Sequence, residues 1–288
     1  MKGVPAPRWL AAAAIAAFLL ISFAYLDRFP VVGQDEPWVA APAYKLATQG
    51  VLGSDLFAGF HGMERHYFEQ MPVYDLLEAA IFRLAGVGVV QMRLLSVLFG
   101  LVLLIVVHAV GREAAGERVA ALAVVLMVTV RIAAPTASRP IGIVLLDAAR
   151  INRYDIPVPA FGLAALLVAI HAVRARSRVW WVSSGVLAGL STLSHLYGAF
   201  WLPVLVVFAL VSDGFSRTAA RSIAMVVAGF ALTLLPWIPS RWYLRIGRLS
   251  SRAQWASGIF STYCICCTSD SRRSICIART ASFVPRTF

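Results

Sequence analysis

The amino-acid sequence predicts an all-α protein, a multi-pass transmembrane helical bundle of about seven to nine spans whose first external loop carries interfacial helices. Composition is the first reason. Of the 288 residues, 60% are hydrophobic and 14% are charged, whereas soluble domains usually carry about 25% charged residues. The second reason is that apolar runs close to the membrane-crossing length of about 20 residues recur along the chain. The third is that basic residues gather in alternate short loops between those runs.

Two of the shorter apolar segments, Leu76–Val90 and Ile141–Ala149, are predicted to be interfacial or membrane-embedded helices packed on protein. The first long run follows Lys2 and Arg8, as the apolar core of a cleaved signal peptide would. It is longer than the usual core of about 7–15 residues, so we expect an uncleaved anchor helix. The predicted spans are Trp9–Leu26, Leu94–Val110, Val119–Ala134, Ile156–Val173, Val179–His195, Tyr197–Val211 and Ser222–Ile238.

Loop charges predict a cytoplasmic N-terminus in the plasma (inner) membrane, because positively charged loops stay on the cytoplasmic side. The loop of residues 27–92 is then external, and it holds eight of the fourteen acidic residues. Residues 131–155 and the turn at His195 are external as well. The net charge of +12 is explained by orientation in a lipid bilayer, so no nucleic-acid partner is expected. The basic residues that carry this signal are Lys2, Arg8, Arg112, Arg118, Arg174, Arg176, Arg178, Arg217 and Arg221.

Composition divides the chain into a membrane-embedded domain, residues 1–239, and an atypical tail, residues 240–288. The tail holds eight arginines, one acid and all four cysteines, and it has no run of membrane length. We interpret it as a frameshifted or wrongly fused C-terminus, with a natural disordered tail as the alternative. Its CICC cluster lacks the paired CxxC spacing of a zinc site.

The candidate chemistry lies in the external loops. The stretch FPVVGQDEPW places two adjacent carboxylates, Asp35 and Glu36, just beyond the first span. Hydration of a loop after a helix end is the plainer alternative. The stretch RHYFEQMPVYDLL adds Arg65 and Glu69 ahead of a helix that Pro72 can start. An interfacial helix without a site is the alternative here.

Two further external segments add charge. ARINRYD contains Arg150, Arg153 and Asp155 at the mouth of a predicted span, and GLSTLSHLYG contains His195. Charges at membrane depth usually face a cavity or a partner, and the planar fork of arginine suits phosphate. The alternatives are ion pairs that anchor a helix and a histidine satisfied at the interface. Together the segments favour an enzyme that handles an anionic, lipid-attached substrate outside the membrane.

These motifs resemble the multi-pass glycosyltransferases of the C-type fold, families 39 and 83, which include protein O-mannosyltransferases and the aminoarabinose transferase of lipid A. Members carry an Asp-Glu pair soon after the first span, as here at Asp35-Glu36, and an Arg-x-Asp motif, as here at Arg153–Asp155. Their Gly-Leu-Ala…Thr-Lys-Gly-like helix end is similar to GLSTLSHLYG. The resemblance covers roughly Trp9–Trp237. Many members also have a Tyr-Phe-Glu-Lys-Pro-Pro segment, matched here at Tyr67, Phe68, Glu69 and Pro72.

The sequence departs from the family pattern at four positions. Gln70 and His195 each stand where lysine is common, and Met71 replaces the first proline. Trp38 stands where the aminoarabinose enzyme has arginine, and it is interpreted as an interface anchor or a platform for sugar stacking. These differences argue against aminoarabinose as the sugar.

The resemblance implies a polyprenyl-phosphate-linked sugar as donor and inverting transfer, on the external side, to a protein, lipid or glycan acceptor. Asp35 is then the expected catalytic base, and Glu36 is predicted to be catalytic with it. Glu69 and Asp155 would position the substrate or hold a divalent metal ion, which is assigned first to Glu69 and is the one cofactor considered. The other residues predicted to bind substrate are Arg65, Arg150, Arg153, His195 and Trp38.

Two other classes of protein are kept open. A transporter or flippase of an anionic amphipathic substrate would show broken helices, internal repeats and polar residues at the membrane midplane. In this sequence no such repeat is evident, and the polar residues gather at one interface. An inactive fragment of a glycosyltransferase is the second alternative, and it depends on whether the unusual tail is the true end of the chain.

Overall fold

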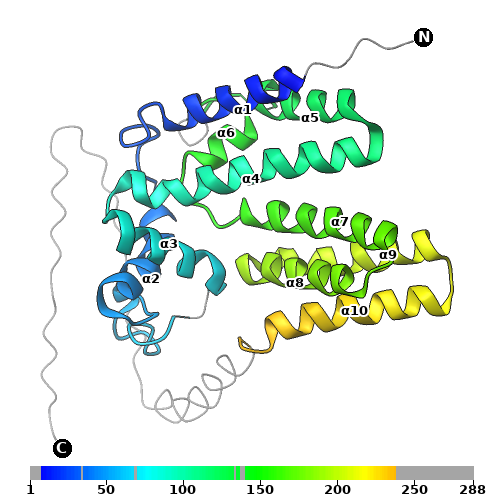
Figure 1. Cartoon of the computed structure of the whole chain (residues 1–288). Coiled ribbons are helices and arrows are strands. Elements are labelled where there is room, and N and C mark those ends of the chain that lie inside the picture. Colours follow the sequence, from blue (N-terminus) through cyan, green and yellow to red (C-terminus); the bar gives the residue numbers. More distant parts are fainter. Residues whose placement is uncertain (1–7, 34, 68–69, 133, 137–139, 238–288) are drawn as a thin grey trace, which may run out of the picture. The chain divides into compact units, whose positions relative to one another are not determined.

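The computed structural model describes residues 8–33, 35–67, 70–132, 134–136 and 140–237, all within the compact unit Met1–Ile246. This part of the chain contains helices and no strand, which confirms the predicted all-α class (Figure 1). The elements are α1 (Arg8–Phe23), α2 (Asp35–Gln49), η1 (Asp55–Phe57), α3 (Pro72–Ala85), α4 (Val89–Ala115), α5 (Glu117–Thr129), α6 (Val144–Ala149), α7 (Pro157–Ala175), α8 (Arg178–Ser194), η2 (Leu196–Phe200), α9 (Trp201–Asp213) and α10 (Arg217–Leu234).

Four helical segments are long and apolar enough to cross a membrane: α4, α7, α10 and the continuous segment Leu196–Asp213 formed by η2 and α9. The apolar part of α1, Trp9–Phe23, is shorter. So are α5 and α8, with 13 and 17 residues. Large apolar side chains such as Val207, Val211 and Leu232 are exposed on α9 and α10. Outward-facing apolar side chains on helices of this length fit a lipid environment.

Glycines explain where two predicted boundaries differ from the observed ones. The predicted segment Leu76–Val90 is divided, because α3 ends at Gly86 with a φ of +81° and α4 starts after the extended Gly88. A φ in this range is easy only for glycine. The helix α4 in turn extends beyond its predicted apolar run at both ends, so its first turns carry Gln91 and Arg93.

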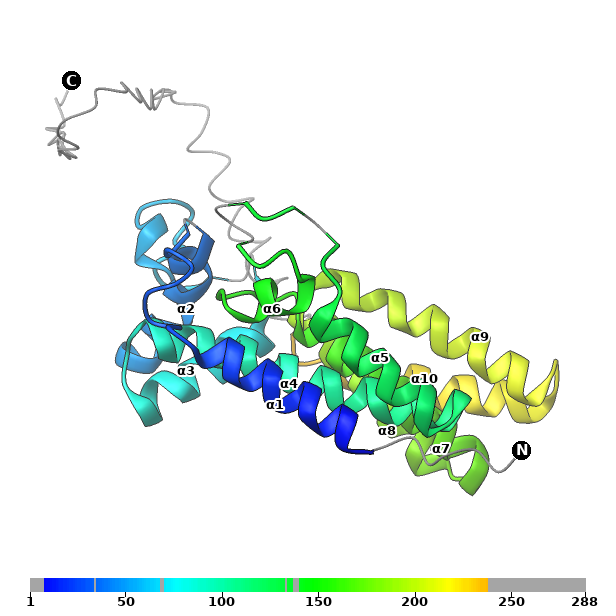
Figure 2. The ribbon, with the colours of Figure 1, turned by 90° about the horizontal axis from the view of Figure 1, so that it is seen from above.

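The long helices run side by side, and α2 and α3 lie together at one end of them (Figures 1 and 2). The helix α8 packs against α7 and α10, while α4 packs against α5 and α7. The helix α3 reaches the bundle through α4 and α8. The C-termini of α1, α5 and α8 and the N-termini of α4 and α7 point to this end, named the α2–α3 end below.

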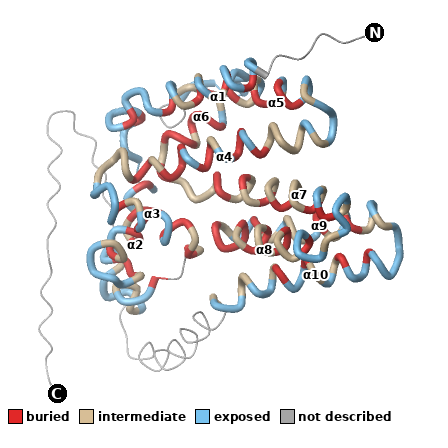
Figure 3. Tube along the Cα trace, in the orientation of Figure 1, coloured by how far each residue is buried: buried red, intermediate tan, exposed pale blue. Residues whose placement is uncertain are grey.

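Many residues on the inner sides of the helices are buried (red in Figure 3), and the apolar ones form three clusters. One joins α1, α4, α5 and α6 around Phe18 and Leu104. A second joins α7 to α10 and is rich in alanine. Within it, a methyl group added to Gly185 would overlap the carbonyl oxygen of Val226, and one added to Gly229 would overlap that of Val182. Small residues thus let the backbones of α8 and α10 approach closely, as is common between membrane helices.

Candidate active site

The first turn of α2 presents two adjacent acids to different surroundings. The Asp35 side chain is 68% exposed, whereas the Glu36 side chain is 3% exposed. Acidic residues are favoured in a first helical turn because unpaired backbone N–H groups and the helix dipole attract negative charge. Glu36 also reaches back to the segment before α2, since its Oε1 accepts a hydrogen bond of 3.1 Å from the backbone N–H of Gly33.

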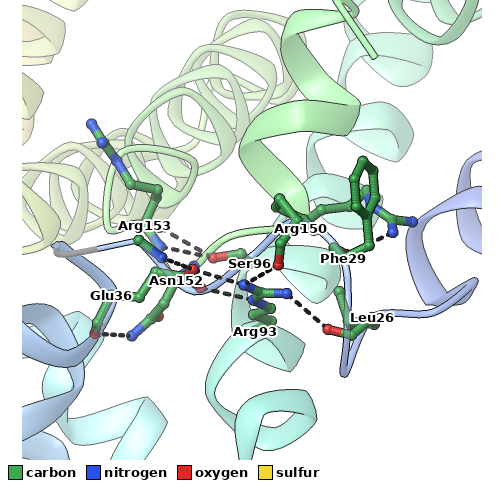
Figure 4. A network of polar contacts seen from close by, with 10 residues as sticks. Leu26, Phe29, Glu36, Arg93, Ser96, Arg150, Asn152 and Arg153 are labelled. Carbon is green, nitrogen blue, oxygen red and sulfur yellow. Dashed lines mark hydrogen bonds and ion pairs between the residues drawn. The ribbon is translucent and has the colours of Figure 1, made fainter. Parts of the chain in front are cut away.

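Arg93, from the start of α4, holds the buried Glu36 carboxylate (Figure 4). Its Nε and Nη2 donate to the two carboxylate oxygens, each at 2.8 Å. The same guanidinium donates to the carbonyl oxygens of Leu26 and Pro30 at 2.9 Å. Arg93 is fully buried, so its charge is balanced by the carboxylate and by carbonyl dipoles rather than by water.

Asn152 connects this ion pair to α3. Its backbone N–H donates to Glu36 Oε2 at 3.0 Å, and its Nδ2 donates to Glu78 Oε1 at 2.9 Å. Its Oδ1 accepts a hydrogen bond of 2.6 Å from the Tyr74 hydroxyl. All four residues are buried. We name Glu36, Tyr74, Glu78, Arg93 and Asn152 the buried network.

The neighbouring segment is fixed in the same way. The backbone N–H of Arg153 donates to Ser96 Oγ of α4 at 3.1 Å (Figure 4). Asn152 is thus bound to α2 and α3, and Arg153 is bound to α4. Arg150 is also buried, and its guanidinium donates to the carbonyl oxygens of Ile21, Ala24 and Phe29. Arg150 therefore fixes the turn that follows α1, and its donors are directed at the chain itself.

A second group of side chains lies at the surface beside the buried network. Arg153 Nη1 lies 3.7 Å from Asp35 Oδ2, and Arg153 Nη2 lies 2.5 Å from Asp155 Oδ2. Tyr154 stacks on the His195 ring with centroids 5.1 Å apart. The three charged side chains are between 38% and 68% exposed. We name Asp35, Arg153, Tyr154, Asp155 and His195 the open cluster.

The charge of Arg153 is well supported. Partial burial acts to lower its pKa, but the hydrogen bond and charge of Asp155, with Asp35 beyond, raise the pKa of Arg153 above its ordinary value overall. The guanidinium is therefore a permanent cation between two carboxylates. A cation and a nearby accessible carboxylate are the two groups that an anionic leaving group and a hydroxyl acceptor require.

The remaining predicted site residues lie elsewhere. Trp38 Nε1 donates to the Tyr67 hydroxyl at 2.8 Å, which ties α2 to the segment before α3. Arg65 is exposed and lies 3.6 Å from its neighbour Glu64. Glu69 lies outside the described residues, so the metal prediction made for it does too. Among the residues that are described, no group of three His, Cys, Asp or Glu side chains is arranged to hold a metal ion.

Three buried residues escaped the sequence predictions, namely Arg93, Asn152 and Glu78, and the buried acid Asp75 of the RHYFEQMPVYDLL stretch was given no role. Charged residues within or beside apolar segments were the available signal, because such charges are costly unless they have a partner or a function. Both oxygens of Asp75 and the Oε2 of Glu78 are buried without a hydrogen-bond partner. Burial raises the pKa of Asp75 well above its ordinary value, and burial together with the charge of Asp75 does the same for Glu78.

A family model described as dolichyl-phosphate-mannose-protein mannosyltransferase matches residues 69–240, more than half of the chain. The chain belongs to this mannosyltransferase family. Membership identifies it as a membrane glycosyltransferase and agrees with the resemblance drawn from the motifs. No curated protein and no solved structure gives a match.

The match to the mannosyltransferase family separates the site into two parts. Arg93, Asn152, Arg153, Asp155 and His195 fall inside the matched residues. Asp35 and Glu36 precede them, so their assignment comes from the geometry described above and from the motif order. The ion contact of Asp35 with Arg153 and the ion pair of Glu36 with Arg93 join the two parts.

Proposed function

We propose that this membrane glycosyltransferase transfers a sugar from a polyprenyl-phosphate donor to a hydroxyl acceptor, with inversion and with Asp35 as general base. The α2–α3 end would face the external side of the plasma membrane, leaving the N-terminus in the cytoplasm. One observation carries the proposal: an exposed carboxylate, Asp35, lies 3.7 Å from the guanidinium of Arg153 beside the stacked Tyr154 and His195.

In the proposed reaction, Asp35 accepts the proton of the acceptor hydroxyl while the acceptor oxygen bonds to the anomeric carbon. The bond from that carbon to the phosphate oxygen breaks, and its electron pair leaves with polyprenyl phosphate. Arg153 stabilises the charge that develops on the phosphate, and His195 can donate a further hydrogen bond. Fixed charges of this kind act most strongly where charge develops in the transition state. Attack from the face opposite the leaving group inverts the anomeric centre.

An apolar cavity supports the lipid part of this proposal. It has a volume of about 360 Å³ and lies between α4, α5, α6 and α7. Leu103, Leu126 and Val144 are among its lining residues, and Asp155 also lines it. A polyprenyl chain in this cavity would place its phosphate near Asp155 and hence near Arg153. An apolar body with a few converging polar groups is the usual form of a ligand site.

The buried residues are assigned supporting roles. We infer that Glu36 positions Asp35 by fixing the first turn of α2 to Arg93 and Asn152. Arg150 likewise positions the turn between α1 and α2, because its guanidinium donates to the carbonyl oxygens of Ile21 and Phe29. Substrate contacts by Arg65 and Trp38, and a divalent cation held by Glu69, stay predictions. The acceptor class, whether protein, lipid or glycan, is likewise part of the proposal, and the family description favours protein.

The test compares Asp35→Asn with Asp27→Asn, a matched change at another exposed acid, which pairs with Arg28. Membranes containing each full-length variant are supplied with labelled polyprenyl-phosphate sugars, and transfer is measured along with the amount of protein. We expect Asp35→Asn to lose transfer by a factor of about 100 or more, since general base catalysis contributes about 10²–10⁴-fold. Asp27→Asn should keep both transfer and protein level.

Two outcomes would contradict the proposal. Transfer retained by Asp35→Asn would remove Asp35 from the mechanism. An absence of transfer in the unmodified chain, combined with uptake of an anionic amphipathic solute into vesicles, would favour the transport alternative.

A further inference from the structure

A second cavity lies away from the candidate active site, where α4 ends and α5 begins. It has a volume of about 350 Å³ and is formed by α1, α4 and α5. Its apolar wall comes from Ala11, Ala12, Ile15 and Ile105. Figures 1 and 2 show the turn between α4 and α5 at the opposite end of the bundle from α2 and α3.

One end of this cavity is polar and carries His108, Arg112 and Glu117. His108 Nε2 lies 3.4 Å from Glu117 Oε1, so the acid already faces a partner. Arg112 Nη2 lies 3.9 Å from Glu113 Oε1, a loose contact, and the Arg112 side chain is 53% exposed. Glu113 in turn is held by Arg174. Arg112 therefore brings to this cavity a permanent positive charge that its neighbour Glu113 compensates weakly.

The surrounding end of the bundle is basic. The described loops and helix ends at 108–118, 171–178 and 213–221 contain seven arginines and three acidic residues, which are Glu113, Glu117 and Asp213. Basic pockets between membrane helices on the cytoplasmic side attract anionic lipid headgroups. The seven arginines are Arg112, Arg118, Arg174, Arg176, Arg178, Arg217 and Arg221.

We propose that the cavity between α1, α4 and α5 binds an anionic phospholipid. The acyl chain lies along the apolar wall of Ala11, Ala12, Ile15 and Ile105, and the phosphate lies against Arg112 and His108. The arrangement of one apolar wall and one cationic end matches the two halves of a phospholipid. This site is separate from the donor cavity lined by Asp155 and does not depend on the proposed transfer reaction.

The experiment measures the melting temperature of the full-length protein in detergent with added phosphatidylglycerol or with phosphatidylcholine of the same acyl chains. A ligand at about 100 times its Kd should raise the melting temperature by about 5 °C or more in a protein of this size. We expect that shift with phosphatidylglycerol alone. Arg112→Gln should abolish it, and Arg112→Lys should restore part of it.

Two further variants separate a defined site from general attraction. Arg178→Gln removes a cation from the same end of the bundle but not from the cavity, so the shift should stay. Ala12→Phe fills the cavity from an exposed position and should reduce the shift while keeping every charge. Equal shifts with the two lipids, or equal losses in Arg112→Gln and Arg178→Gln, would overturn the proposal. Phosphatidylglycerol adducts in native mass spectrometry give the same comparison for any variant with a lowered melting temperature.

Discussion

The buried network and the open cluster begin at neighbouring residues of α2 and satisfy their charges in opposite ways. Around Glu36, the carboxylate oxygens and the Arg93 donors are bound within the chain at about ordinary hydrogen-bond distances. Around Asp35, the cation of Arg153 is 3.7 Å away and the side chains face solvent. The comparison teaches that one helical turn can bury one of its two acids in a bonded network and leave the other exposed beside a cation.

Arg93→Met tests the buried network and should have the largest effect on stability. It leaves the Glu36 carboxylate buried without its cation, and breaking a buried pair in this way typically costs about 3–5 kcal/mol. Denaturant or thermal unfolding in detergent measures the loss. Arg28→Met is the control, since Arg28 is 80% exposed and pairs with the adjacent Asp27. Equal stability of the two variants would mean that the Glu36–Arg93 pair does not hold the fold.

Arg153→Gln tests the open cluster and should affect catalysis more than stability. Removal of one group that stabilises transition-state charge typically lowers kcat by about 10²–10³-fold. The unfolding free energy should change by about 1 kcal/mol or less, because the pairs of Arg153 are partly exposed. Kinetic assays with a labelled donor, run beside unfolding, separate the two effects. A large loss of stability with unchanged turnover per folded protein would place Arg153 with the buried network instead.

Asp75→Asn tests a third case, a buried acid without a partner. Its raised pKa means that the folded state keeps a proton that the unfolded state releases above the ordinary pKa of 3.8. Stability should therefore fall as pH rises above that value, by at most about 1.4 kcal/mol per pH unit. Asp75→Asn should reduce this slope to the part that Glu78 contributes, and it should be more stable than the unmodified protein at pH 7. Unfolding measured from pH 4 to pH 8 checks this. An unchanged slope, or one that Asp27→Asn reduces as well, would contradict it.

Trp38→Phe should have the smallest effect. It removes the hydrogen bond from Trp38 Nε1 to the Tyr67 hydroxyl, and one such bond contributes about 1 kcal/mol. A double-mutant cycle with Tyr67→Phe measures the coupling between the two side chains. A large loss of transfer without loss of stability would instead favour the predicted contact of Trp38 with the sugar.

The bundle was the most predictable part of the molecule, because apolar length and loop charge are local signals. The runs at Ile156–Val173 and Val179–His195 correspond closely to α7 and α8. The division between α3 and α4 depends on the backbone conformation of Gly86. The hydrophobicity of a segment carries no information about that conformation. In the site, the contact of Arg153 with Asp155 was within reach of sequence reasoning, since the two residues are neighbours.

The buried network was beyond such reasoning, because its partners are far apart in the chain. Arg93 lies 57 residues after Glu36, and Asn152 lies 116 residues after it. Arg150 shows the same limit. A guanidinium group can bind phosphate or carbonyl oxygens, so the sequence alone could not choose between these partners for Arg150. The path of the turn after α1 places the carbonyl oxygens of Ala24 and Phe29 beside it.

The separation of Glu36 from Asn152 also has a consequence for biogenesis. Ribosomes add about 5–20 residues per second, so Asn152 is made about 6–23 seconds after Glu36. Until Asn152 has been made, the Glu36 carboxylate lacks one of the hydrogen-bond donors that hold it in the folded chain. The loop that carries Asp35 can adopt its final form only after α4 and the segment before α7 have inserted. The candidate catalytic base is thus synthesised well before the Asn152 backbone that completes the hydrogen bonds of its neighbour Glu36.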